Sequence, residues 1–238
     1  MRVAIAGATG LVGRPLVQAF RQADHHVVEL SRATGIDLSD GAGLDLTGVD
    51  VVIDVTNSPS LEQHEATRFF TSVAENFGRA ATAAGVRRTV VLSIIGVDQT
   101  PEDGYFVAKL AHEHATQEHA PNVRVLRAAQ FHDFAGQMLG WMRDGDTAMI
   151  PDWPTQPVDL EEVIRVLLEV ATREDGAALS ELAGPQSERL PDMVARLDPS
   201  VAVTAGSASD AIRSGALRPG PDAIIAGDDF GSWLERAR

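Results

Sequence analysis

The feature that most constrains the fold is an alternation, across the first half of the chain, between short apolar runs and longer segments of helical period. The runs that we expect to form strands cover residues 2–7, 26–32, 49–58, 87–96 and 122–131. The segments with apolar residues at helical spacing cover 11–24, 65–84 and 105–119. Strands and helices in this rhythm form parallel βαβ units, with helices on both faces of one sheet. The sequence therefore predicts an α/β fold with a doubly wound parallel sheet.

Beyond residue 131 the alternation loosens. A helix is expected over 158–174, and only three shorter segments follow it. We interpret residues 1–238 as a single domain, with a core at about 1–131 and a small C-terminal lobe at about 132–238. This region has too few strands to build a second core, so we expect it to lie over the sheet.

Composition excludes several classes of function. The chain is 44% hydrophobic and 23% charged, which indicates a folded protein. Its formal net charge of -14 would repel nucleic acid. It has no cysteine, which excludes disulfides, thiol catalysis and thiolate metal sites. No apolar stretch is long enough to cross a membrane or to act as a signal segment, so we expect a cytoplasmic protein with no membrane partner.

A glycine triplet closes the first predicted strand. Gly7, Gly10 and Gly13 stand in the stretch GATGLVG, between this strand and the first helix. At this point of a βαβ unit, glycines let the backbone approach a pyrophosphate, which the N–H groups and dipole of the helix N-terminus then bind. The alternative is an ordinary strand-to-helix turn. We expect a dinucleotide to contact Gly7, Thr9, Gly10, Leu11, Val12 and Gly13.

The end of the second strand indicates which dinucleotide binds. An acidic residue there would accept hydrogen bonds from the ribose of NAD, whereas this chain has Ser31 and Arg32, which suit the 2′-phosphate of NADP. We therefore expect NADP(H), with NAD(H) as the alternative. The other interpretation of Arg32 is a solvated charge at the end of a strand.

Two more pairs of residues are candidates for cofactor contact. Asp37 and Leu38 are placed to flank an adenine, although a helix N-cap at Asp37 or Ser39 explains the same residues. Thr56 and Asn57 follow the third strand, at the carboxyl edge where such sheets bind ligands. They either line the cofactor or simply begin the next loop.

The only tyrosine and the only lysine of the chain lie one helical turn apart. Tyr105 and Lys109 are four residues apart within a predicted helix, so their side chains share one face. A nearby ammonium favours the ionised phenol and brings its pKa from about 10 toward neutral pH, which makes Tyr105 a usable general acid or base. Ser93 ends the fourth predicted strand, where its hydroxyl can orient a substrate carbonyl. The alternative is that Tyr105 packs and Lys109 is a solvated charge.

Several stretches together resemble one known superfamily. GATGLVG, LSR, VLSIIGVD, YFVAKLAHE, VLRAAQFHDF and AGP resemble the short-chain dehydrogenases/reductases, and within them the atypical NmrA-like NAD(P)-binding group. The resemblance implies a Rossmann fold and hydride transfer with catalytic roles for Ser93, Tyr105 and Lys109, and it implies that Lys109 binds the nicotinamide ribose. The chain departs from the pattern at Ala128 and Ala129, where relatives often have Pro-Gly. No residue, Asn76 included, matches the asparagine that completes a proton relay in many relatives.

The expected activity is that of an NADP(H)-dependent oxidoreductase that transfers hydride to or from a ketone, quinone or similar carbonyl compound. The alternatives are a non-catalytic NADP(H)-binding redox sensor, and an isomerase, epimerase or dehydratase of the same superfamily. We expect a small-molecule substrate that is bulky and hydrophobic, in contact with Ser93, Tyr105, Phe131, His132 and Phe134. The chain is expected to be a monomer or a homodimer.

The histidines do not form a metal-binding pattern. His112 and His114 are two residues apart, which points them away from each other on a helix, and no HExxH spacing occurs. We expect His112, His114 and His119 to be solvated and no metal to bind. His132, just past the fifth strand, is either an auxiliary acid or a residue that lines the pocket or packs.

Overall fold

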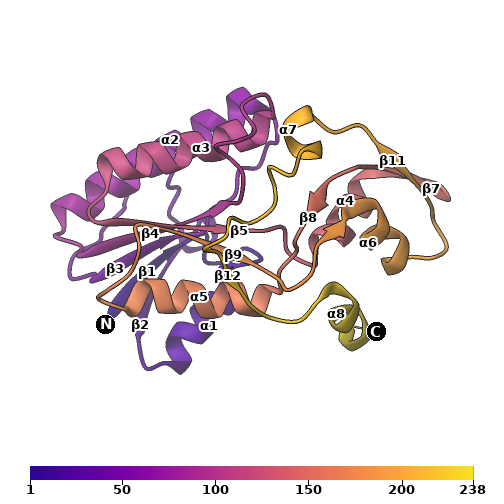
Figure 1. The fold of residues 1–238 in the computed structure, drawn as a ribbon. Helices are drawn as coiled ribbons and strands as arrows, with labels where there is room; N and C mark the ends of the chain where they lie inside the picture. The colour runs from indigo at the N-terminus through magenta and orange to yellow at the C-terminus, as the bar shows by residue number, and fades with distance from the viewer. Residues whose placement is uncertain (238) are drawn as a thin grey trace. The chain divides into compact units, whose positions relative to one another are not determined.

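The chain contains a seven-stranded parallel sheet, seen in Figure 1 in a computed structural model that describes residues 1–237. In order across the sheet the strands are β12 (Ile224–Ile225), β9 (Leu179–Ala183), β5 (Val123–Ala128), β4 (Arg88–Ile94), β3 (Val51–Asp54), β1 (Arg2–Ala6) and β2 (His26–Leu30). This arrangement confirms the predicted doubly wound α/β class. Five of the strands were predicted from the sequence, and the other two, β9 and β12, come from the C-terminal region.

Helices flank the sheet on both sides, as the βαβ pattern requires. Figure 1 shows α2 and α3 over one face and α1 and α5 over the other. The helices bury apolar residues against the strands. Their bounds are α1 (Gly13–Gln22), α2 (Gln63–Ala83), α3 (Gly104–His119) and α5 (Leu160–Thr172). The helix α3 also buries polar side chains, among them Lys109 and His112.

The helices α2 and α3 cross at close range. A Cβ atom at Gly78 of α2 would lie 2.8 Å from the carbonyl carbon of His119, so a larger residue would force the two backbones apart. Phe70 and Ala108 are fully buried between the helices. Gly85, at a φ of 69°, follows the end of α2 in the left-handed conformation that glycine adopts readily.

The strands β1 and β3 end level with each other. In the pairing register Ala6 lies opposite Asp54. The chain beyond β3 stays beside β1, because the N–H of Val55 donates to the carbonyl oxygen of Ala6 at 3.1 Å. Parallel sheets of this kind bind ligands at the carboxyl ends of their strands. The residues that follow Ala6 and Asp54 are therefore gathered at the edge of the sheet where a site is expected.

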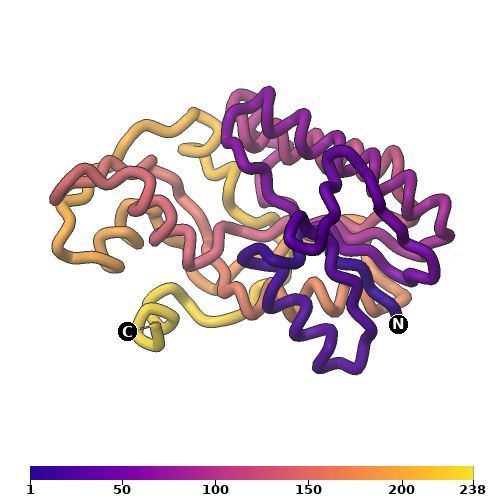
Figure 2. Tube along the Cα trace, turned by 180° about the vertical axis from the view of Figure 1, so that it is seen from behind, coloured from indigo at the N-terminus to yellow at the C-terminus, as the bar shows by residue number. Residues whose placement is uncertain are grey.

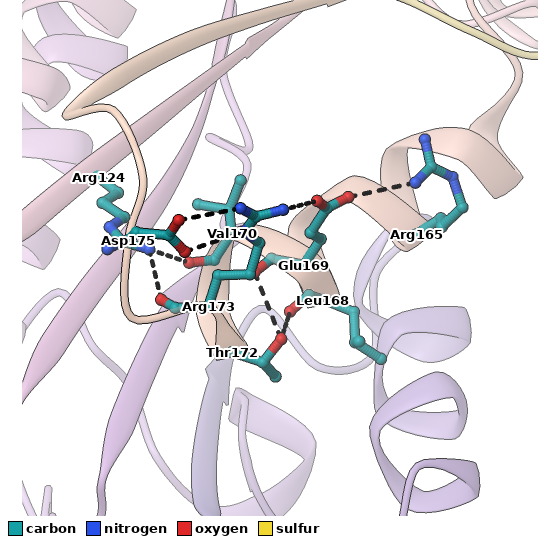
Figure 3. A network of polar contacts seen from close by, with 8 residues as sticks. All are labelled: Arg124, Arg165, Leu168, Glu169, Val170, Thr172, Arg173 and Asp175. Carbon is teal, nitrogen blue, oxygen red and sulfur yellow. Dashed lines mark hydrogen bonds and ion pairs between the residues drawn. The ribbon is translucent and has the colours of Figure 1, made fainter.

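A buried arginine fixes the C-terminal end of α5. The guanidinium of Arg124, on β5, donates to the carbonyl oxygens of Val170, Arg173 and Glu174 at 2.9, 2.8 and 2.7 Å (Figure 3). Carbonyl groups in the last turn of a helix have no partner within the helix, so these bonds cap it. The nearby ion pair between Arg173 and Asp175 lies on the surface and contributes little to stability.

The long connection from β2 to β3 can be followed in Figure 2. It begins with a short 3₁₀ turn, Arg32–Thr34, in which the Ser31 hydroxyl accepts from the N–H of Thr34 at 3.3 Å. Further along, the side-chain amide of Asn76, on α2, donates to the carbonyl oxygens of Leu38 and Ser39 at 3.1 Å each. Asn76 thus fixes the middle of the connection to α2 and has a role in the fold.

The chain forms two compact units. One unit comprises Met1–Ser93, Asp103–Leu126 and Ile164–Ser180, and the other comprises Ile94–Glu102, Arg127–Val163 and Glu181–Arg238. The second unit also contains α4 (Phe134–Met142), β6 (Arg143–Asp144), β7 (Thr147–Pro151), β8 (Pro154–Thr155), β10 (Glu188–Arg189), α6 (Leu190–Leu197), β11 (Ala202–Gly206), α7 (Asp210–Arg213) and α8 (Phe230–Ala237).

This second unit has a hydrophobic core of its own. Its centre includes the fully buried side chains of Ile150, Met193, Val194 and Phe230. The expectation that the C-terminal region cannot build a second core was therefore wrong, because α4, α6 and α8 supply the apolar faces that short strands alone do not. No helix within residues 1–237 combines the length and apolar character that crossing a bilayer requires.

Candidate active site

The glycine turn between β1 and α1 is closed so tightly that only glycine fits. Gly7 has a φ of 80°, and a Cβ atom on it would lie 2.8 Å from the carbonyl oxygen of Val55. A Cβ atom on Gly13 would lie 2.1 Å from the carbonyl oxygen of Gly7. The N–H of Gly10 donates to that same carbonyl oxygen at 2.9 Å. The first turn of α1 is thereby pressed against the end of β1.

The top of this turn is open to a ligand. Thr9, Gly10 and Leu11 are exposed, whereas Val12 and Gly13 are buried against the sheet. The exposed backbone leads directly into the N-terminus of α1, where N–H groups lack partners within the helix. Contact between a dinucleotide and these residues stays a prediction.

At the end of β2 the structure separates the two residues predicted to bind a 2′-phosphate. Ser31 is buried, and its hydroxyl caps the following 3₁₀ turn. Arg32 is exposed. Asp37 accepts from both the N–H and the hydroxyl of Ser39, at 2.9 and 2.6 Å, and these bonds, with a smaller contribution from the charge of Arg32, lower the pKa of Asp37. Asp37 and Ser39 form a turn and no helix begins there, so the N-cap interpretation was wrong.

A cavity of about 380 Å³ lies beside these residues. It is bounded by the connection after β2, the loop after β3 and the first turns of α2. The side chain of Leu38 packs in the core, and its neighbour Ser39 lines the cavity. The lining residues are Ser39, Ser58, Pro59, Ser60, Glu65, Arg68, Phe69 and Ser72. Hydroxyl groups and one arginine therefore surround an opening next to the residues predicted to flank an adenine.

The hydroxyl of Tyr105 is held by the loop after β3. It donates a short hydrogen bond to the side-chain oxygen of Asn57, which is exposed. The ring of Tyr105 meets Phe70 edge to face, with centroids 5.9 Å apart. Burial raises the pKa of Tyr105 to about 12. The expectation that the neighbouring lysine brings this pKa toward neutral was therefore wrong.

The ammonium of Lys109 has partners other than Tyr105. Lys109 is only 4% exposed, and its Nζ donates to the carbonyl oxygen of Leu92 at 2.9 Å. It also lies 3.1 Å from Nδ1 of His112 and 4.6 Å from the ring centre of Phe70. Burial lowers the pKa of Lys109 to about 8. Tyr105 and Lys109 share a helix face as predicted, and Phe70 contacts both.

His112 and Asp54 complete this buried group, and sequence reasoning missed both. His112 was expected to be solvated, but it is fully buried and stacks on Phe70 at 4.8 Å. Its Nε2 lies 3.0 Å from Oδ2 of Asp54, which is 1% exposed. The spacing of His112 three residues after Lys109 was the available signal, because residues three apart share a helix face. His114, on the opposite side, is exposed as expected.

Two hydroxyl groups beside this edge lack partners. Oγ of Ser93, near the end of β4, and Oγ1 of Thr56, after β3, are both buried with no hydrogen-bond partner within residues 1–237. A buried hydroxyl without a partner is costly, which is the pattern expected where a bound group completes the bonding. The predicted roles of Ser93 and Thr56 stay predictions.

The three residues predicted to contact substrate from the C-terminal side all lie in the second unit. Phe131 is half-buried, and Phe134 stacks on Trp153 with centroids 6.0 Å apart. His132 is fully buried between Phe230 and Trp233, and its Nε2 bonds the carbonyl oxygen of Asp228 at 3.0 Å. This environment agrees with the packing interpretation of His132. Substrate contact by these residues stays a prediction.

The sequence is similar to that of one characterised reductase, described below. No family model matches the chain. The (4-alkanoyl-5-oxo-2,5-dihydrofuran-3-yl)methyl phosphate reductase of Streptomyces griseus subsp. griseus is 28% identical over 219 residues, which cover 82% of this chain and 72% of the relative.

Solved structures resemble the whole chain. The dTDP-4-dehydrorhamnose reductase of Bacillus anthracis, solved in complex with NADP, superposes with a TM-score of 0.74 at 14% identity and covers 99% of this chain and 97% of its own. The protein MoeE5, solved with UDP-glucuronic acid and NAD, has a TM-score of 0.74 at 19% identity and covers 100% of both chains. At these identities the likeness shows the fold alone. The chain has the Rossmann-like α/β fold that these NAD- and NADP-bound proteins share.

Proposed function

We propose that the chain is an NADP(H)-dependent oxidoreductase that reduces the carbonyl group of a small, largely apolar molecule. The observation that carries the proposal is the bond from the Tyr105 hydroxyl to Asn57. It holds the chain's only phenol at the carboxyl edge of the sheet, where the glycine turn also lies. Membership of the NmrA-like group is part of this proposal.

The residues at this edge fit a nicotinamide dinucleotide. The closed turn at Gly7 and Gly13 leaves exposed backbone above the N-terminus of α1, which suits a pyrophosphate. The unpartnered hydroxyls of Thr56 and Ser93 offer hydrogen bonds further along the same edge. Arg32 offers a charge for a 2′-phosphate. When bound, the dinucleotide supplies the hydride.

In the proposed mechanism the chain orients the carbonyl group and moves one proton. The Ser93 hydroxyl donates a hydrogen bond to the carbonyl oxygen and orients it. Tyr105 donates its phenolic proton to that oxygen as negative charge develops there. Lys109 supplies a positive charge beneath the site and, in this proposal, binds the nicotinamide ribose. Before substrate binds, Asn57 accepts the hydrogen bond of this phenol and holds it at the edge of the sheet, and that bond breaks when Tyr105 turns its single proton to the substrate oxygen.

The protonation of Tyr105 favours reduction over oxidation. With a pKa of about 12, the phenol is protonated at pH 7, which is the form that a proton donor needs. In the oxidation direction the same group would have to lose its proton first. The protonated phenol therefore fits the role of proton donor in reduction.

The comparisons support the same class of chemistry. The Streptomyces relative is a reductase whose name places alkanoyl and oxo groups on its substrate. Other solved proteins of this fold include the UDP-N-acetylglucosamine 4-epimerase of Bacillus cereus, at a TM-score of 0.70. A sugar-nucleotide epimerase or dehydratase is therefore the second candidate.

The test is a turnover assay with purified protein. NADPH is mixed with a panel of ketones, quinones, α,β-unsaturated lactones and UDP-sugars, and the absorbance of the reduced nicotinamide is followed. Steady oxidation with a carbonyl substrate is the expected result. Tight NADPH binding with no oxidation across the panel would favour the sensor, and conversion of a UDP-sugar without net oxidation would favour the second candidate.

The predicted contact of Arg32 with the 2′-phosphate can be tested by comparing the affinities for NADPH and NADH. We expect Arg32→Glu to raise the Kd for NADPH by about tenfold or more while leaving the Kd for NADH within about twofold, because the charge-assisted bond to the 2′-phosphate is lost. Fluorescence titration of both cofactors measures this. Arg165→Glu makes the same charge change on α5, at an exposed surface pair with Glu169, and serves as the control. Equal effects on both cofactors would contradict the role of Arg32.

The raised pKa of Tyr105 can be measured directly, because the chain has one tyrosine. In protein labelled with ¹³C at the tyrosine ζ-carbon, a single resonance reports ionisation. We expect it to stay at its un-ionised position through pH 10, where an ordinary tyrosine is about half ionised. A midpoint near pH 7 or 8 would instead restore the original expectation that Lys109 lowers the pKa.

A further inference from the structure

Beneath the proposed active site lies a chain of three buried polar side chains from two elements. Asp54 ends β3, and Lys109 and His112 lie on α3. Nε2 of His112 is 3.0 Å from Oδ2 of Asp54, and Nδ1 of His112 is 3.1 Å from Nζ of Lys109. All three residues are less than 5% exposed. A charged group with so little solvent around it persists only where its neighbours compensate it.

These distances fix the proton positions on His112. Nδ1 faces an ammonium, which only donates, so Nδ1 is the acceptor in that bond. Nε2 then carries the ring proton and donates it to the carboxylate of Asp54. Burial and the charge of Lys109 lower the pKa of His112, in agreement with a neutral ring. The imidazole of His112 thus links the carboxylate of Asp54 to the ammonium of Lys109 by two hydrogen bonds.

The same carboxylate also forms a hydrogen bond to the loop that holds Tyr105. Oδ1 of Asp54 accepts from the N–H of Thr56 at 2.8 Å. The next residue, Asn57, accepts the hydrogen bond from the Tyr105 hydroxyl. Asp54 is therefore linked to two of the three predicted catalytic residues, to Lys109 through Oδ2 and His112, and to Tyr105 through Oδ1 and the loop that carries Asn57.

We propose that Asp54 and His112 are positioning residues of the active site. Together they hold the ammonium of Lys109 against the Leu92 carbonyl of β4, and through Thr56 the same carboxylate orients Asn57 toward the Tyr105 hydroxyl. The inference rests on the proposed function, because it assigns these residues to the same reaction.

The charge on Lys109 depends on groups from each element around it. Asp54 of β3 and Glu113 of α3 favour the ammonium, burial opposes it, and Phe70 of α2 and the Leu92 carbonyl complete its surroundings. Removing the carboxylate removes the nearest negative charge and disfavours the ammonium. Removing the imidazole acceptor does the same to a smaller extent. Both changes should therefore lower the pKa of Lys109.

The experiment uses the single lysine of the chain. In protein labelled with ¹³C at the lysine ε-carbon, one resonance titrates with Lys109, with an expected midpoint of about 8 in the unaltered protein. We expect Asp54→Asn to lower this midpoint by about one pH unit or more. His112→Phe keeps the stacking on Phe70 and should lower it less. His112→Asn keeps a hydrogen-bond acceptor near the lysine. Its Lys109 midpoint should lie between that of His112→Phe and that of the unaltered protein. The control His114→Asn, at an exposed histidine of the same helix, should leave the midpoint unchanged.

Turnover provides the second readout. The pH at which kcat falls on the alkaline side should move down with the Lys109 midpoint in Asp54→Asn and His112→Phe. A cooperative thermal transition establishes that each variant is folded, and if Asp54→Asn fails to fold, the two His112 variants carry the test. A Lys109 midpoint that stays at the unaltered value in the folded variants overturns the inference, even if melting temperatures fall. If no substrate is reduced at all, the proposed function fails, while the titration still decides whether Asp54 and His112 set the state of Lys109.

Discussion

Replacing Tyr105 by Phe is expected to lower kcat for NADPH-dependent reduction by about 10²- to 10⁴-fold. The substitution removes the only phenolic hydroxyl of the chain and leaves the ring, whose edge-to-face contact with Phe70 is apolar. The proton that the developing alkoxide needs must then come from water, which is neither oriented nor held by Asn57. The Kd for NADPH should change by less than about twofold, because the predicted cofactor contacts do not involve this hydroxyl. Stopped-flow and steady-state assays measure the two quantities separately.

Thr71→Val provides the matched control for this substitution. It also removes one hydroxyl, but from α2, where that group bonds the carbonyl oxygen of Thr67 within the same helix. Its kcat should remain within about twofold of the unaltered protein. Full activity of Tyr105→Phe would remove Tyr105 from the mechanism and leave a hydride transfer that needs no proton donor from this residue.

The fold was predictable because its signals are local and repeated. Each strand of the N-terminal half is an apolar run, and each helix shows the 3.6-residue period, so residues 2–131 could be ordered into βαβ units. The glycine turn was predictable for the same reason, since a strand, a glycine triplet and a helix follow one another directly. The strand β12 has only two residues, and β9 lies outside the regular strand-helix alternation, so neither was identified from the sequence.

The candidate site was only partly predictable, because its electrostatics depend on contacts between distant segments. The sequence places Tyr105 and Lys109 on one helix face, which the structure has as well. The sequence does not show how deeply these residues are buried. Burial raises the pKa of Tyr105 and lowers the pKa of Lys109. Asp54 and His112 are 58 residues apart, so their contact could not be read from spacing. The spacing of His112 three residues after Lys109, which places both on one helix face, was the signal that could have suggested its burial.

Gly13→Ala is expected to have the second large effect, on stability and on cofactor binding together. A Cβ atom at this position would lie 2.1 Å from the carbonyl oxygen of Gly7 and 2.7 Å from Cα of Ala8. Both contacts are with backbone atoms, so no side chain can rotate away to relieve them, and α1 must move from the end of β1. We expect the free energy of unfolding to fall by about 1–3 kcal/mol, as for other overpacked sites. Urea denaturation followed by circular dichroism measures the loss.

The displacement of α1 in Gly13→Ala also tests whether the turn binds the cofactor or only packs α1 on the sheet. If the turn from Gly7 to Gly13 binds a pyrophosphate, moving α1 withdraws its N-terminal N–H groups, and the Kd for NADPH should rise by about tenfold or more in the fraction that remains folded. Gly140→Ala is the control, because Gly140 is an exposed helical residue of α4 with no atom within 4 Å of the added methyl group. There alanine improves helix propensity by up to about 1 kcal/mol, so stability should hold or rise and NADPH binding should not change. A destabilised Gly13→Ala protein that still binds NADPH with unaltered affinity would show that the tight turn serves only the packing of α1 on the sheet.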